Sequence, residues 1–393
     1  MKRFLLEILI TTSVILILAG LFVYRTDPFY MFRGPSEGES VYLYSQVYQT
    51  PGAAEHFSYD YAIVGTSMTE NMRASWFKNN MGPYALLGKQ GATDHRTAKF
   101  SYAGAHLKDI SYVLDRIFES ENQVAMICID LEDYQLVGDP EQTYTEWPDY
   151  IYEPVWWKET QYLWNEDVLW AGLGRTLETV TGRIPDPDDF YTWEDPSYFS
   201  EENAKRSYSE NLAQMQRNME IDGKTSFPAE DGISNCLDNI ALIEDTIAAH
   251  PETKFYFFYP PYSILYWERQ EECGRTDYII NVYKAAAEKL LQYSNVQFYS
   301  FQWDEEYITD LSQYRDEAHH TPIGNWYVFQ TMFGTYSVPG RGLSSYWDPS
   351  MMEEQLYLDA QHGTWLFDAD SVEEYYRDLS AHVKNYPYET LWE

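Results

Sequence analysis

Four short apolar runs, each as long as a typical β-strand, constrain the fold of this chain most strongly. They cover residues 59–65, 124–130, 254–259 and 296–300. Among them, apolar residues recur at every third or fourth position over 107–118, 237–247 and 279–290, as on one face of a helix. Strands that alternate with such helices predict an α/β fold with a doubly wound parallel sheet covered by helices on both faces. In sheets of this kind, ligands bind where the strands end.

The amino-terminal segment predicts a membrane anchor. Residues 4–24 form an apolar stretch with Glu7 as its only charge. The stretch is long enough to cross the hydrocarbon core of a bilayer. No small-x-small cleavage site follows near Ala19, so we expect an uncleaved, single-pass signal anchor. The flanking positive charges are nearly balanced between the two ends: Lys2 and Arg3 against Arg25 and Arg33. The usual orientation then places the chain from about residue 30 onward outside the cytoplasm.

The composition excludes several classes of function. The 393 residues include 27 Lys and Arg against 62 Asp and Glu, a formal net charge of −35, so we expect no nucleic-acid partner. Aromatic residues make up 17% of the chain, far too many for a disordered acidic protein. Three cysteines allow at most one disulfide, with Cys236–Cys273 left open as a pairing, and their spacing fits no zinc site. We predict no metal and no cofactor.

The chain divides into three expected parts. Residues 1–30 form the anchor, 31–338 the α/β domain, and 339–393 a carboxy-terminal helical extension with a helix over 371–383. The strand and helix pattern breaks over about 137–234, where seven prolines accompany six of the 13 tryptophans, and this stretch is interpreted as an insertion. Its aromatic residues are either a platform for sugar rings or a satellite core at the sheet edge. They are Trp147, Trp156, Trp157, Trp164, Trp170 and Trp193, with Tyr144, Tyr150, Tyr152 and Tyr162.

A serine lies where the first predicted strand gives way to a helix. The segment 65–71 reads GTSMTEN, with Ser67 just after the strand. A hydroxyl at that position projects from the carboxyl edge of the sheet, and the backbone N–H groups beside it can hold a developing oxyanion. The alternative is structural, because Thr66 or Ser67 could simply cap the helix that follows.

An Asp and a His follow the last predicted strand. In the segment 314–322, YRDEAHHTP, Asp316 precedes His319 by three residues. This spacing lets the carboxylate accept a hydrogen bond from one imidazole nitrogen while the other nitrogen faces the cleft. Pro322 then begins a helix with an apolar inner face of Ile323, Trp326, Phe329 and Met332. A serine after the first strand and this pair after the last are a rare combination in an α/β chain.

With these motifs, the sequence resembles the SGNH (GDSL-like) hydrolase superfamily, in particular its membrane-anchored members in bacterial envelopes that serve D-alanyl transfer and alginate acetylation. The resemblance rests on segments 65–71, 316–320 and 257–263, the last reading FFYPPYS. It implies a flavodoxin-like sheet of SGNH type, with Ser67 as nucleophile, His319 as general base and Asp316 as its orienting acid. It also implies an oxyanion hole formed by the N–H groups of Ser67 and Gly91.

The chain departs from the family pattern in its third block. The family usually has an asparagine there in a G-x-N-D turn, whereas residues 129–134 of this chain read IDLEDY. Loss of a neutral donor from an oxyanion hole costs about 10² or more in rate. A slow hydrolase, a transferase with other donors and an inactive relative therefore all remain open.

The resemblance implies a serine esterase or O-acyltransferase that acts on acyl groups, with acetyl expected, of an envelope polysaccharide. The alternative is a catalytically inactive glycan-binding or assembly protein that works with a membrane O-acyltransferase. Further residues that we expect to line the substrate site are Asn71, Asp130, Tyr262, Ser263, Trp156 and Trp157.

Overall fold

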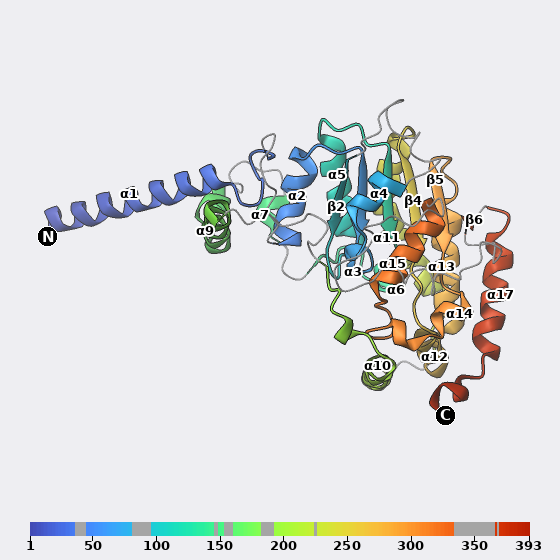
Figure 1. The fold of residues 1–393 in the computed structure, drawn as a ribbon. Coiled ribbons are helices and arrows are strands. Elements are labelled where there is room, and N and C mark those ends of the chain that lie inside the picture. Colours follow the sequence, from blue (N-terminus) through green and yellow to red (C-terminus); the bar gives the residue numbers. More distant parts are fainter. Residues whose placement is uncertain are drawn as a thin grey trace. The chain divides into compact units, whose positions relative to one another are not determined.

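The protein forms two compact units in a computed structural model (Figure 1). It describes residues 1–35, 45–80, 96–144, 148–152, 160–181, 192–223, 226–333, 366–367 and 369–393. The first unit comprises residues 1–58, 115–122 and 145–190, and the second comprises 59–114, 123–144 and 191–393. This division differs from the expected anchor, domain and extension. Residues 145–190 belong to the first unit, and residues 137–144 and 191–234 belong to the second. The stretch of about 137–234 that was interpreted as an insertion is therefore divided between the two units.

The second unit is built on a sheet with the strand order β2-β1-β3-β4-β5-β6. The five parallel strands are β1 (Tyr61–Gly65), β2 (Thr97–Ser101), β3 (Met126–Asp130), β4 (Lys254–Tyr259) and β5 (Val296–Ser300). The order 2-1-3-4-5 is that of doubly wound, flavodoxin-like sheets, and the topological switch point lies between β1 and β3. The predicted α/β class and parallel sheet are confirmed.

Helices cover both faces of this sheet (Figure 1). The side chains of β4 alternate between the two layers: the Tyr256 ring contacts Phe333 of α15 (Pro322–Phe333), and the Tyr259 hydroxyl donates to the backbone of Tyr283 in α13 (Thr276–Leu290). Helix α15 packs against α4 (Ala74–Asn80) on its face, and α13 packs against α11 (Ala229–Ala249) on the other. Because both faces are covered, the central strands β1, β3 and β4 are largely apolar rather than alternating.

The remaining elements of this unit lie between the strands or, for the last turn in the list, at the carboxy-terminus. They are α3 (Ser67–Glu70), α5 (Leu107–Glu119), α6 (Asp133–Val137), α10 (Glu201–Asp222), α12 (Ile264–Glu272) and α14 (Glu305–Ile308), with the 3₁₀ turns Pro196–Tyr198, Leu311–Gln313 and Tyr388–Trp392. The last turns of α5 belong to the first unit.

The carboxy-terminal extension is part of the α/β unit. Its short strand β6 (Leu366–Phe367) pairs antiparallel with β5. Its helix α17 (Val372–Asn385) packs on α13 and buries Val372, Tyr376, Leu379 and Val383. The predicted helix over 371–383 is confirmed, whereas the edge strand was not predicted.

The first unit contains the apolar helix α1 (Lys2–Thr26), which is long and apolar enough to cross a membrane. It also contains α2 (Gln46–His56), α7 (Asp149–Tyr152), the 3₁₀ helix η2 (Thr160–Trp164) and α9 (Glu166–Thr181). Both η2 and α9 pack against α1, so the apolar helix is not an isolated segment.

Most predicted elements are found within a few residues of their expected bounds. The runs 254–259 and 296–300 coincide with β4 and β5, and the helical patterns correspond to α5, α11 and α13. Strand β2 was not predicted. Its segment TAKFS is only five residues long, and because polar and apolar residues alternate in it, it contains no apolar run. The Lys99 ammonium of this strand donates to the carbonyls of Glu70 and Met72, which accounts for a cation in the sheet.

Candidate active site

Ser67 lies at the carboxyl end of β1, as the first residue of α3. Thr66 caps this short helix, since its side-chain oxygen accepts from the backbone N–H of Met68 at 3.1 Å. Thr66, and not Ser67, is therefore the residue whose side chain caps the helix. The Ser67 hydroxyl is left for another partner, and Ser67 is 8% exposed.

The structure brings Ser67 and His319 into direct contact across 252 positions of sequence. The distance between Ser67 Oγ and His319 Nε2 is 2.7 Å. On the other side of the ring, His319 Nδ1 is 2.8 Å from Asp316 Oδ2. A carboxylate bound at Nδ1 leaves Nε2 without a proton, so the ring can accept the proton of the serine hydroxyl.

The loop that carries Asp316 and His319 is fixed by its own backbone. Asp316 Oδ1 accepts from the N–H groups of Ala318 and His319, at 2.9 and 2.8 Å. The N–H of Arg315 donates to the carbonyl of His319, and a bridge between Tyr314 and His320 closes the loop. The D-x-x-H spacing is thus sufficient to orient the carboxylate and the imidazole locally.

The pKa values of the pair are shifted in opposite directions. Burial lowers the pKa of His319, but the hydrogen bond and charge of Asp316, together with the charge of Glu132, outweigh it and raise this pKa above 6.5. Burial raises the pKa of Asp316, but the hydrogen bonds from His319 and Ala318 and the charge of His319 bring it below 3.8. Asp316 therefore stays ionised and stabilises the imidazolium that forms when His319 takes a proton.

Asp130 supports the serine turn from below rather than lining a substrate surface. Its two oxygens accept from the Thr66 N–H at 2.9 Å and the Thr66 hydroxyl at 2.6 Å, and the residue is completely buried. Burial raises the pKa of Asp130 to about 6 despite these hydrogen bonds. A Cβ at Gly65 would lie 1.7 Å from Asp130 Oδ1, so glycine is required where this carboxyl group approaches β1.

Glu132 is a second buried acid in the departing third block. The Tyr262 hydroxyl donates to its Oε2, and Tyr262 is itself buried. Burial and the neighbouring charge of Asp130 raise the pKa of Glu132 to about 7. Glu132 is 5% exposed and its charge raises the pKa of His319, although it was not predicted as a site residue.

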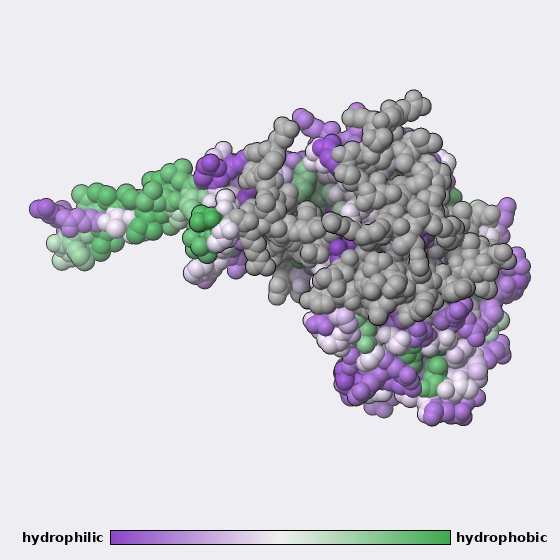
Figure 2. All heavy atoms as spheres, in the orientation of Figure 1, coloured by the Kyte–Doolittle hydropathy of each residue, from purple (hydrophilic) through white to green (hydrophobic). Residues whose placement is uncertain are grey.

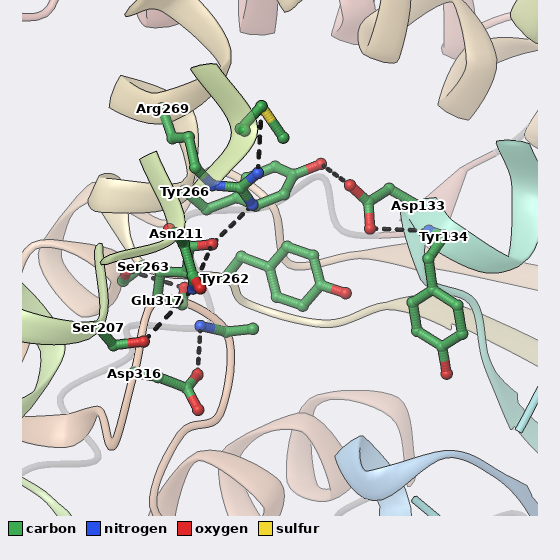
Figure 3. Close-up of polar contacts among 12 residues, drawn as sticks. Asp133, Tyr134, Ser207, Asn211, Tyr262, Ser263, Tyr266, Arg269, Asp316 and Glu317 are labelled. Atoms are coloured by element: carbon green, nitrogen blue, oxygen red, sulfur yellow. Dashed lines mark hydrogen bonds and ion pairs between the residues drawn. The ribbon is translucent and has the colours of Figure 1, made fainter. Parts of the chain in front are cut away.

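A buried ion pair holds the loop of Asp316 and His319 from the far side (Figure 3). Glu317 Oε1 lies 2.6 Å from Arg269 Nη2 and accepts from the Asn211 amide at 3.2 Å. The Ser263 hydroxyl and N–H both donate to the Glu317 carbonyl at 2.9 Å. Burial raises the pKa of Glu317 to about 7, although the charge of Arg269 opposes the shift. Ser263 is buried, so its contact in the structure is with this loop.

Trp193 is the aromatic residue of the predicted insertion that reaches the site. Its ring meets the His319 ring edge to face at 5.2 Å, and the Arg315 guanidinium lies 5.8 Å from the Trp193 ring centre. The Asn71 side chain is completely buried, and its Oδ1 accepts from the backbone N–H of Trp193 at 3.0 Å. The next residue, Glu194, forms a buried ion pair with Arg73 at 2.8 Å. Residues just after the serine helix therefore hold Trp193 in place.

Other predicted site residues lie outside the described part of the chain. These are Gly91, Trp147, Trp156 and Trp157. The described members of the proposed aromatic platform fall into different units: Trp164, Trp170, Tyr150, Tyr152 and Tyr162 in the first, and Tyr144 and Trp193 in the second. They do not form one surface within either unit.

The second histidine and the cysteines do not form a metal site. Burial lowers the pKa of His320 to about 4, and its Nδ1 contacts the backbone of Thr321. Among the described residues, no group of three His, Cys, Asp or Glu side chains could hold a metal ion. Cys128, Cys236 and Cys273 are free and buried.

Comparison with known proteins finds no protein-family model and no curated protein that matches this chain.

Replacing Gly65 with alanine should disturb the site through Asp130. Because the new methyl group overlaps the carboxyl group, we expect Gly65→Ala to lower the free energy of unfolding by about 1–3 kcal/mol and to slow reaction of Ser67 with a fluorophosphonate. Gly223→Ala is the control, because alanine there strains the backbone at the end of α10, where φ is 61°, without touching any neighbouring atom. Equal labelling rates for the two folded variants would contradict the role given to Gly65.

Removing the cation of the buried pair should destabilise the protein. Arg269→Met leaves the Glu317 carboxylate buried without its partner, which costs about 3–5 kcal/mol. The loss should be smaller at pH 5 than at pH 8, because Glu317 is protonated at the lower pH. Denaturant unfolding at both pH values measures this. Arg377→Met removes an exposed arginine as the control, and Arg269→Met with Glu317→Gln should recover part of the stability. A loss independent of pH would argue against this interpretation.

Proposed function

We propose that this protein is a serine esterase or O-acyltransferase of the SGNH-like type. One observation carries the proposal: Ser67 Oγ, His319 and Asp316 form a continuous chain of hydrogen bonds of 2.7 and 2.8 Å at the end of a parallel strand. This is the arrangement in which a hydroxyl becomes a nucleophile at neutral pH. The flavodoxin-like strand order supports the resemblance to the superfamily, in which a serine follows the first strand.

The reaction begins when Ser67 Oγ attacks the carbonyl carbon of an ester and His319 Nε2 takes the hydroxyl proton. As the tetrahedral intermediate collapses, the bond to the sugar oxygen breaks and His319 returns the proton to that oxygen. The acyl group is then bound to Ser67. Water or another hydroxyl attacks the acyl-enzyme, again with His319 as base, and restores the serine.

The oxyanion requires donors near Ser67. The N–H of Ser67 belongs to the first turn of α3, where backbone donors have no partner within the helix. Gly91 is the second donor that the family resemblance implies. Asp130, the first acid of the third block, binds Thr66 through both of its oxygens, which supports a site in which its carboxylate does not face the oxyanion.

An O-acylated polysaccharide, with acetyl as the expected group, is the proposed substrate. The Trp193 ring beside His319 offers a flat apolar surface on which a sugar ring could lie. The net charge of −35 favours a neutral or amino-sugar glycan over a polyphosphate chain. These two features support the proposal in different ways, through the site and through the overall field.

The proposed location is the outer side of a cell membrane, with α1 as a single-pass anchor. The length and apolar character of α1 support a span, and the usual orientation of such anchors supports the side. A tethered enzyme of this kind would act on envelope polymers close to the membrane, and a membrane O-acyltransferase is its possible partner.

Two observations favour the alternative of an inactive glycan-binding protein. Ser67 is nearly buried, and two acids stand where the family usually has a neutral donor. Reaction with an electrophile distinguishes the two functions, because a binding protein has no need for an activated serine.

A fluorophosphonate should label Ser67. Ser67 Oγ attacks phosphorus, His319 takes the proton and fluoride leaves, so the wild-type protein gains one covalent adduct that mass spectrometry locates in the peptide containing residue 67. Ser67→Ala should abolish labelling, whereas Ser111→Ala, which changes a hydroxyl bound only to the Lys108 carbonyl in the described structure, should leave it unchanged. No adduct on folded wild-type protein would favour the inactive alternative.

The labelling rate should rise with pH with a midpoint above 6.5. Only neutral His319 can take the serine proton, and Asp316 raises the pKa of this imidazole, so activity is lost as the pH falls below that raised value. Asp316→Asn should move the midpoint to lower pH and slow the reaction by about 10³–10⁴-fold. Asp378→Asn on the exposed face of α17 is the matched control. A wild-type midpoint below 6.5 would contradict this account of the site.

A further inference from the structure

The outward face of α9 is an apolar stripe. Trp170, Leu173, Leu177 and Val180 recur at intervals of three and four and are 65%, 44%, 65% and 80% exposed. From Val168 to the end of the helix, the charged residues are Arg175, which is buried, and Glu178, which is half-buried. Glu166, which is exposed four residues before Trp170, begins this face, and the turns that follow carry no exposed charge. Four exposed large apolar side chains on one helix face are unusual on a surface in contact with water.

The opposite face of α9 is held firmly against the end of α1. A Cβ at Gly172 would lie 2.8 Å from Thr26 Oγ1 and 3.1 Å from the Phe22 ring, so the two helices approach closely there. Arg175 donates to the carbonyl of Asp27 at 2.8 Å. The guanidinium of Arg175, the buried cation of α9, therefore points toward α1 and away from the apolar stripe.

The residue that ends α1 makes this arrangement rigid. The carboxylate of Asp27 accepts from the N–H groups of Met31, Phe32 and Arg33 and from the Tyr162 hydroxyl, at 2.9 to 3.1 Å. Tyr162 belongs to η2, immediately before α9. The exit of α1, η2 and the start of α9 therefore form one hydrogen-bonded junction.

The contacts along α1 place this junction within the apolar run. The Trp164 indole, 48% exposed, donates to the carbonyl of Leu16 at 2.9 Å and packs on Gly20. If the membrane ended at Leu16, only residues 4–16 would remain inside, about 18 Å of helix at about 1.5 Å per residue. The hydrocarbon core of a bilayer is about 30 Å thick. For α1 to span it, Trp164 must enter the membrane as well, and α9, which contacts α1 at Phe22 and Thr26, then lies near the boundary of the hydrocarbon core.

The direction of α9 fits this position. In Figure 1, α1 runs in the plane of the view and α9 is seen nearly end-on, so the two axes cross steeply. If α1 crosses a membrane, α9 then lies along its surface. Figure 2 shows the apolar surface of α1 continuing onto α9.

From these observations we propose that α9 is a membrane-interface helix whose stripe of Trp170, Leu173, Leu177 and Val180 is buried among lipid acyl chains. Interfacial helices bury such a face about 5–10 Å into the headgroup and acyl boundary. The occupant is lipid, because α9 packs against α1, whose apolar surface is also exposed, and the one polar atom of the stripe, the Trp170 indole nitrogen, already donates to Glu166 at 3.4 Å. This inference rests on the proposed membrane anchor, and not on the esterase activity.

The test measures the surroundings of single labels on the full chain in phosphatidylcholine vesicles. Leu177→Cys and Val180→Cys each receive the fluorophore NBD, and the buried native cysteines are measured as the blank. The matched control is Ile221→Cys on α10, an apolar side chain that is 81% exposed in the α/β unit. Labels on α9 should emit at shorter wavelength, be quenched strongly by doxyl-labelled lipid, and be several-fold less sensitive to aqueous iodide than the label at position 221.

Equal iodide quenching at positions 177, 180 and 221, in vesicles that contain no other protein, would overturn the proposal. The stripe would then be a surface for a protein partner or for a second copy of this chain. Flotation of the vesicles separates this result from failure of the anchor. Protein that floats but has water-exposed labels contradicts the role of α9 alone, whereas protein that does not float contradicts the anchor too. Fluorophosphonate labelling of the same samples reports on Ser67 independently.

Discussion

The hydrogen bond between Ser67 and His319 depends on two local structures that are built separately. On one side, Thr66 caps α3 and is held by Asp130, which fixes the direction in which the serine leaves β1. On the other, Asp316 binds both the backbone and the ring of His319. The parallel sheet then brings the two together, because the ends of β1 and β5 lie at the same edge. Neither local structure alone makes a reactive serine.

Buried charge surrounds this contact. Asp130, Glu132 and Glu317 all lie in the interior, and burial raises the pKa of each. Each carboxyl group is held by a hydroxyl, an N–H or an arginine, which is the usual condition for keeping such groups inside a protein. The network does not touch the reacting atoms, except through the charge of Glu132 on His319. Its role is to hold the serine turn and the histidine loop in one relative position.

The first unit, which contains α1, is held together by a different interaction. There the carboxylate of Asp27 gathers four donors at the point where α1 ends, and the helices around it share an outward apolar surface. A lone transmembrane helix can rotate and tilt freely, whereas a helix joined rigidly to a second one that lies along the membrane cannot. The proposed interface helix would therefore define how the anchor is oriented in the bilayer.

Much of this molecule was already determined by its sequence. Apolar runs and helical periodicity are local properties, so the strands β1, β3, β4 and β5 and the α/β class could be predicted. Asp316 and His319 could also be predicted as a pair, because a spacing of three residues is enough to bring the carboxylate to the imidazole. Tertiary structure alone decided the rest. Strand β2 is too short for its alternating pattern to predict a strand, and β6 has only two residues and is defined by its pairing with β5. Arg269, Asn211 and Glu317 are distant in sequence and become partners only when folding removes water from between them. The same holds for Asp130, Asn71, Tyr262 and Ser263, because polar residues near a strand end can face either substrate or the interior, and only the packed neighbours determine which.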